Sequence, residues 1–391
     1  MTKSRGLNRY VKKVSIPFLY SNPIGKFLLT EEVANIWTHF KDPYKNNELV
    51  KRAKDVLEDI KDPLRRYYIS TIPQAKFYKG LLLQGYMISP MFLSNLEDLT
   101  IHSADVFLVS YPRSGTTWTE EVLSCIISDA DPAYLSIDLH ERVVHLEVGA
   151  PFRHESIVET LDSPRLLATH LPFQYCPKQL RNLKCKVILV LRNPKDQLVS
   201  YYHFHETAGF LGGKRHPWNK FFECYLQGHL VYGSWFDHTK TWWEEAKKHP
   251  DKILVITYEE MQTDLAKMVK IIGEFLGKPV KEETLPKIIN HCSFSTMKRN
   301  KAVNRSEVPV KGLFDNQSKS FMRSGRIGDW MSHFSPGQVE IFDEIYEEKM
   351  AGTGLTLTFT AEETSRVMAE KGRVINQFVD CKPNAEEKEN L

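Results

Sequence analysis

An anion-binding turn is indicated by the segment YPRSGTTW at residues 111–118, which follows an apolar run and precedes a helical pattern. Pro112 and Gly115 favour a tight turn. Hydroxyl groups and a cation beside the free N–H groups of a helix start would attract an anion. The candidate residues for binding this anion are Arg113, Ser114, Gly115, Thr116 and Thr117. A capped structural turn would have the same local pattern, and the Walker pattern is absent.

A second strand-to-helix junction lies in RNPKDQLVSYYHF at residues 192–204. Asn193 is a favourable N-cap and Pro194 suits the first helical position. Arg192 leaves the strand end, and Ser200 follows about two turns into the helix. Alone, this segment indicates a capped helix with a surface arginine. Taken together with the first turn, it predicts a second anion-binding site.

A parallel sheet must position these junctions. Near-continuous apolar runs alternate with helical patterns, as in parallel strands covered on both faces; they span 105–110, 165–170, 186–192 and 252–258. The sequence therefore predicts an α/β fold with a central parallel sheet flanked by helices. We expect three regions: a partly helical extension of unknown function (1–76), the main domain (77–360) and a charged, disordered tail (361–391).

Composition narrows the function classes. The net charge of +3 is too small to favour nucleic acid or a membrane as main partner. The six cysteines form no CxxC pair and no metal-ligand spacing, so we expect reduced thiols and no metal. No stretch approaches the roughly 20 apolar residues of a membrane span, and a cytoplasmic location is expected.

Seven motifs in register resemble the cytosolic sulfotransferases, over roughly residues 77–358. They lie at 111–118, 169–172, 192–204, 232–238, 257–261, 291–298 and 321–330. The resemblance implies a P-loop-like three-layer fold and an enzyme that transfers the sulfuryl group of 3′-phosphoadenosine 5′-phosphosulfate (PAPS). The acceptor would be the hydroxyl of a small phenol, steroid or other alcohol, and 3′,5′-phosphoadenosine (PAP) would be the product.

The resemblance also implies which residues hold PAPS. The turn Arg113–Thr117 would bind the 5′-phosphosulfate, and Arg192, Ser200, Arg323 and Gly325 the 3′-phosphate. Trp118 and Phe294 would sandwich the adenine, with Tyr258 at its edge; ordinary core packing is the alternative for these aromatic residues. The remaining implied contacts are Cys292, Ser293, Met297, Phe321, Met322 and Ser324.

The implied catalytic residues are His170 and Arg113. In-line sulfuryl transfer needs positioning and positive charge, and the acceptor hydroxyl needs a base near neutral pH. By resemblance, His170 takes the acceptor proton and Arg113 stabilises the bridging oxygen as PAP leaves.

Four positions depart from the family pattern. Arg113 replaces the usual turn lysine, Ala168 the lysine two residues before the base, Ser324 a second lysine and Cys292 a common threonine. Arg165 or another basic side chain is a candidate to compensate for the cation missing at Ala168. These departures leave open an alternative, a weakly active or inactive PAPS-binding protein. The family's short dimer motif should fall at residues 331–340, where only Glu340 matches it. The sequence therefore leaves monomer or homodimer undecided. A Golgi carbohydrate sulfotransferase and a nucleotide kinase are disfavoured, because a membrane anchor and the Walker lysine are not found.

Overall fold

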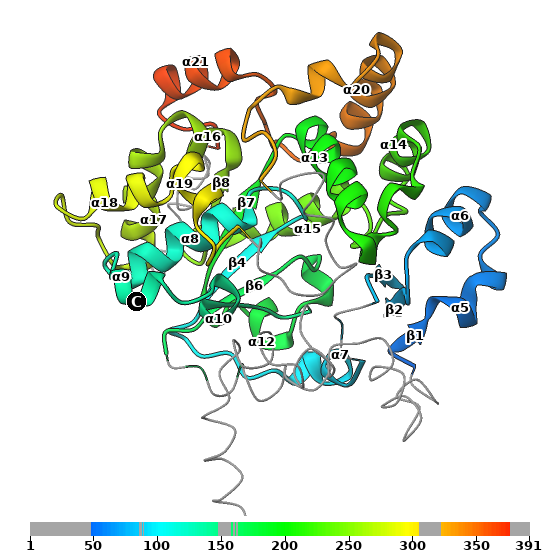
Figure 1. Ribbon diagram of the computed structural model, residues 1–391, viewed down its shortest axis with the longest axis horizontal. Helices are drawn as coiled ribbons and strands as arrows, with labels where there is room; N and C mark the ends of the chain where they lie inside the picture. The colour runs from blue at the N-terminus through cyan, green and yellow to red at the C-terminus, as the bar shows by residue number, and fades with distance from the viewer. Residues whose placement is uncertain are drawn as a thin grey trace, which may run out of the picture.

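A five-stranded parallel sheet forms the centre of the protein. The computed structural model describes residues 48–85, 88, 90–147, 158, 161, 163–304 and 322–375. The strand order is β5-β6-β4-β7-β8, with bounds Val143–His145 (β5), Leu166–Thr169 (β6), Val106–Ser110 (β4), Lys186–Leu191 (β7) and Ile253–Thr257 (β8). Figure 1 labels β4, β6, β7 and β8. Four of these strands confirm the predicted runs, and β5 was missed.

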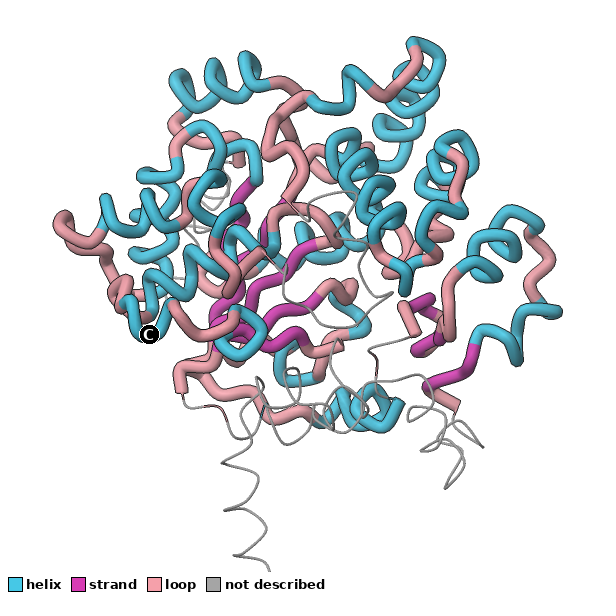
Figure 2. Tube along the Cα trace, viewed as in Figure 1, coloured by secondary structure: helices cyan, strands magenta, loops and turns pink. Residues whose placement is uncertain are grey.

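Each face of this sheet packs into its own core, because successive side chains of a strand point to opposite faces. In β4, Phe107 and Val109 belong to one core, whereas Val106 and Leu108 belong to the other. Helices cover both faces, as Figures 1 and 2 show, so the structure confirms the predicted three-layer α/β fold.

The core that contains Leu108 is covered by helices from residues 116–142 and 258–299, the first of which directly follows the predicted anion-binding turn. They are α8 (Thr116–Ile127), α9 (Pro132–Leu135), α10 (Leu139–Arg142), α16 (Tyr258–Thr263), α17 (Leu265–Leu276), α18 (Leu285–His291) and α19 (Phe294–Arg299). The opposite core takes side chains from α6 (Pro63–Thr71), α12 (Lys178–Arg181), α13 (Pro194–Thr207), α14 (Trp218–Leu226), α15 (Trp235–Lys248), α20 (Pro336–Met350) and α21 (Ala361–Lys371). Two short helices, α5 (Ala53–Val56) and α7 (Pro90–Asn95), complete the set in the described chain.

A small antiparallel sheet crosses the predicted boundary between residues 76 and 77. Its strands are β1 (Val50–Arg52), β2 (Lys76–Tyr78) and β3 (Leu81–Leu83). Val50 pairs with Tyr78, and both side chains are buried in the main core. The part of the extension that the structure describes therefore belongs to the domain, and the boundary at residue 76 is wrong.

The predicted disordered tail does not begin at residue 361. Residues Ala361–Lys371 form α21, which the Thr360 side chain caps by accepting a hydrogen bond from Glu363 N. Arg373 then pairs with Glu260 of α16 at 2.6 Å, and Val374 and Ile375 are buried. The charged composition after residue 360 led to the prediction of disorder, but the segment forms an amphipathic helix that buries Thr364 and Met368. Residues 376–391 lie outside the described part.

In the described part of the chain, no helix combines the length and apolar character that crossing a membrane would need.

Candidate active site

The first turn has the strained backbone of a binding loop. It leaves β4 at Ser110 and enters α8 at Thr116. Gly115 has φ +103°, and a Cβ there would come within 2.8 Å of the Tyr258 ring, so glycine is required. Arg113 has φ +68°, a costly conformation for a residue with a side chain. Such strain is found at sites where the backbone must face a ligand.

Several donors at this turn point to an anion. The Ser114 hydroxyl is buried and has no hydrogen-bond partner among the described residues. The first N–H groups of α8 add further donors at the positive end of the helix. Arg113 donates from Nε to Ser200 Oγ at 3.3 Å and packs over the Phe204 ring. The turn from β4 and helix α13 are thereby brought together, as the two sequence motifs predict.

Arg192, which follows β7, also contacts the first turn. Its guanidinium donates to the Arg113 carbonyl at 3.1 Å and lies 4.3 Å from the centre of the Tyr258 ring. The Arg192 Nε is buried and has no partner among the described residues. Because an unpaired buried donor costs about 1–3 kcal/mol, this guanidinium fits a site that is completed by an anion.

His170 lies directly beyond β6, and its ring is oriented by β4. The Nδ1 atom lies 2.7 Å from the Ser110 carbonyl, which can only accept, so Nδ1 carries the proton. The Nε2 lone pair is therefore free to take a proton. Burial, and next the neighbouring His145, lower the pKa of His170 to about 3, which keeps the ring neutral at neutral pH.

A buried carboxylate that the sequence did not single out fixes the backbone at His170. Glu147 accepts from the His170 N–H at 2.6 Å and from the Thr169 hydroxyl at 2.8 Å. Burial raises the pKa of Glu147. Its sequence context, an acid inside an apolar stretch, carried no sign of this role.

The last motif is attached to helix α13 by Asp196. Its carboxylate accepts from the N–H of Gly328 at 2.8 Å and of Trp330 at 2.9 Å. Asp196 lies in the first turn of α13. The structure shows that it also joins the segment carrying Arg323 to the segment carrying Arg192.

Within that segment, Arg323 pairs with Asp329, and the Ser324 hydroxyl donates to the same carboxylate at 3.3 Å. Gly325 has φ +67°, and a Cβ there would lie 2.7 Å from the Phe294 ring. The last motif therefore packs against the start of α19. Met322 packs against the core on the α8 side, and Phe321 lies outside the described residues.

The predicted adenine residues gather on the same side of the sheet. Trp118 donates from its indole to the Cys292 carbonyl at 2.8 Å and meets Tyr258 edge to face, with ring centres 5.5 Å apart. Phe294 is 39% exposed, unusual for a phenylalanine and suited to stacking. Ser293 caps α19 by accepting from Thr296 N, and Met297 is buried in the core.

Arg165 does not compensate for the missing lysine. Its guanidinium is buried and forms a two-pronged ion pair with Asp105, with Nε 2.9 Å from Oδ1. It also donates to the carbonyls of Val158 and Thr100. These bonds use the side chain to tie the starts of β4 and β6 together.

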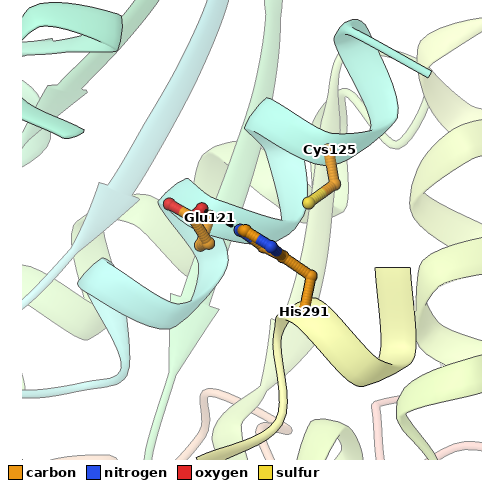
Figure 3. Close-up of side chains that lie close together, drawn as sticks. All are labelled: Glu121, Cys125 and His291. Atoms are coloured by element: carbon orange, nitrogen blue, oxygen red, sulfur yellow. Dashed lines mark hydrogen bonds and ion pairs between the residues drawn. The ribbon is translucent and has the colours of Figure 1, made fainter. Parts of the chain in front are cut away.

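One group of possible metal ligands lies deeper along α8. Atoms of Glu121, Cys125 and His291 lie within 4.8 Å of one another, and Figure 3 shows the His291 ring reaching toward the other two side chains. Glu121 already bonds His291 at 2.6 Å and the buried guanidinium of Arg142 at 2.8 Å. Because Arg142 would repel a further cation, we interpret the group as an ion-pair network that joins α8, α10 and α18.

Comparisons with known proteins agree with this architecture. The family model for the sulfotransferase domain matches residues 103–354. Dog sulfotransferase 1B1 is 39% identical over 288 residues, covering 72% of this chain and 95% of the relative. The crystal structure of mouse sulfotransferase SULT7A1 complexed with PAP matches with a TM-score of 0.60 at 33% identity, covering 75% of this chain and 98% of that one.

A structure of retinol dehydratase with retinol and PAP shares the fold, with a TM-score of 0.65 at 23% identity over 79% of this chain and 98% of that one. Taken with the family match and the identity to the sulfotransferases, the chain belongs to the cytosolic sulfotransferase family and is a sulfotransferase enzyme.

Proposed function

We propose that this enzyme transfers the sulfuryl group of PAPS to a hydroxyl of a small phenol, steroid or other alcohol, with His170 as the general base. The observation that carries the proposal is the hydrogen bond from His170 Nδ1 to the Ser110 carbonyl at 2.7 Å. It holds a neutral imidazole beside the strand that leads into the anion-binding turn.

The donors around the turn fit an anionic nucleotide. The buried Ser114 hydroxyl and the Arg192 Nε have no partner among the described residues, and both would be satisfied by phosphate oxygens. Arg113 and Arg192 together offset the charge of such a ligand. The exposed Phe294 ring and the half-buried Trp118 suit a flat base. When bound, PAPS would supply a sulfuryl group on a phosphate leaving group.

The protein's own groups then move the proton and the charge. His170 Nε2 accepts the proton of the acceptor hydroxyl as that oxygen bonds to sulfur and the bond from sulfur to the bridging oxygen breaks. Arg113 stabilises the charge that develops on the bridging oxygen. A bound anion raises the pKa of a nearby histidine. The nucleotide would therefore raise the pKa of His170 from about 3 toward the range of an effective base.

Transfer from labelled PAPS to a panel of phenols, steroids and alcohols tests this function. His170→Ala should reduce kcat on the order of 1,000-fold while PAP still binds, measured by titration calorimetry. His249→Ala is the matched control, because this histidine is exposed at the end of α15. Full activity of His170→Ala would exclude the proposed base, and absence of transfer in the unaltered enzyme would exclude the reaction. The family relationship supports a cytosolic location for this activity.

A further inference from the structure

A second histidine lies beside the proposed base on the strand that the sequence did not predict. His145 ends β5, and its ring centre lies 5.2 Å from that of His170. Its Nε2 lies 2.5 Å from Glu120 Oε1, and the two side chains are 10% and 2% exposed. Burying a carboxylate is costly unless a charge compensates for it. The pair is therefore best satisfied with a protonated imidazole.

The register of the sheet relates His145 to the lysine that this chain lacks. His145 is directly paired with Ala168 in the parallel ladder of β5 and β6, and side chains paired in this way point to the same face of a sheet. A lysine at position 168 would thus share its face with His145. Ala168 is fully buried and brings no cation to this face.

The ring of His145 also keeps one donor unused. Its Nδ1 is buried and has no hydrogen-bond partner among the described residues. Glu120 holds the other nitrogen, and the two N–H groups of an imidazolium point to opposite sides of the ring. Glu120 lies one helical turn after Thr116, on the helix whose start forms the anion-binding turn. The unused donor belongs to a ring whose centre lies 5.2 Å from that of the proposed base.

We propose that His145, held protonated by Glu120, supplies the positive charge and hydrogen-bond donor that the family's lysine provides, and stabilises the sulfuryl group during transfer. This inference rests on the proposed function. The titratable groups around the pair are Glu120 on α8, Glu147 beyond β5, His170 beyond β6 and His238 on α15. Burial lowers the pKa of His238 to about 3, so that ring stays neutral.

A cation at His145 has two consequences for the base. It disfavours protonation of His170, in agreement with the direction in which His145 shifts that pKa. It also gives the two histidines distinct roles, with His170 as the neutral base and His145 as the charged donor.

The test compares kcat and PAP affinity in His145→Gln, Glu120→Gln and the double variant His145→Gln/Ala168→Lys. His145→Gln should lose kcat on the order of 100-fold and bind PAP as before. In the double variant part of kcat should return, because the lysine restores a cation on the same face of the sheet. Glu120→Gln keeps the size of the side chain but removes its charge, so it should also lower kcat while PAP still binds.

His145→Gln with unchanged kcat, while His170→Ala is inactive, would overturn the inference and leave the proposed function intact. If His145→Gln does not fold, an unchanged kcat in Glu120→Gln would overturn it instead. Failure of the proposed function has a different signature, because then the unaltered enzyme does not transfer from PAPS or His170→Ala keeps its full rate.

Discussion

Two successive glutamates of α8 are both buried and both bound to a histidine, yet they lie in different electrostatic surroundings. Glu120 bonds His145 of β5 at 2.5 Å, beside the proposed base. Glu121 bonds His291 of α18 at 2.6 Å and also the buried guanidinium of Arg142. A guanidinium stays charged at any physiological pH, whereas an imidazolium can lose its proton. The Glu121 network can therefore serve structure, while the Glu120 pair lies where it can take part in the chemistry.

The largest effect should come from breaking the structural network. Glu121→Ala leaves the Arg142 guanidinium buried without its carboxylate, which we expect to cost about 3–5 kcal/mol of unfolding free energy, measured by urea denaturation at neutral pH. Glu274→Ala, an exposed position on α17, is the control and should change stability by less than about 0.5 kcal/mol. A loss below about 1 kcal/mol in Glu121→Ala would mean that the network is dispensable.

The second effect concerns the pH dependence of kcat and kcat/KM, which His170, beside the Glu120 pair, should set. Because the pKa of His170 is lowered to about 3, the base stays neutral far below the ordinary range of histidine, and the acid limb of kcat/KM should lie well below pH 6.5. The acid limb of kcat should lie higher, because bound nucleotide raises the pKa. Initial rates measured across pH give the acid limbs of kcat and kcat/KM. Glu121→Gln, measured in the same way, is the comparison enzyme. Acid limbs of kcat and kcat/KM that coincide near pH 6.5 would contradict this prediction.

The smallest effect should come from His291. His291→Gln removes an imidazole from Glu121 while Arg142 still pairs with the carboxylate, so we expect a loss of about 1 kcal/mol in stability and an unchanged kcat. The comparison with His145→Gln, made in the same assays, is the sharpest contrast between the two histidines. Equal losses of kcat in the two variants would remove the distinction drawn between the two glutamates.

The sequence predicted the parts of the fold and site that depend on local pattern. The apolar runs that became β4, β6, β7 and β8 were readable because each is longer than three residues and flanked by helical patterns. The cap at Asn193 was confirmed, with its side chain accepting from Asp196 N. The structure also brings Arg113, Ser200 and Arg192 together, as the paired motifs indicated.

What the sequence did not reveal depends on pairing between distant segments. Strand β5 has three residues and ends in His145, so its own pattern is too short to be distinguished from a loop. The contact of His145 with Glu120 spans 25 residues and exists because β5 lies beside β6. Asp196 likewise bonds Gly328 and Trp330, more than 130 residues away, which no local pattern indicates.

The docking of the chain after residue 360 limits how far this protein can be shortened. Glu260 accepts from Arg373 and from the N–H of Val374. It also completes the capping box that begins α16, the helix whose first residue is Tyr258. A protein ending at residue 360 would leave this buried carboxylate without its guanidinium, close to the Tyr258 ring that packs against Gly115. Any minimal version of the enzyme should therefore extend at least through Ile375.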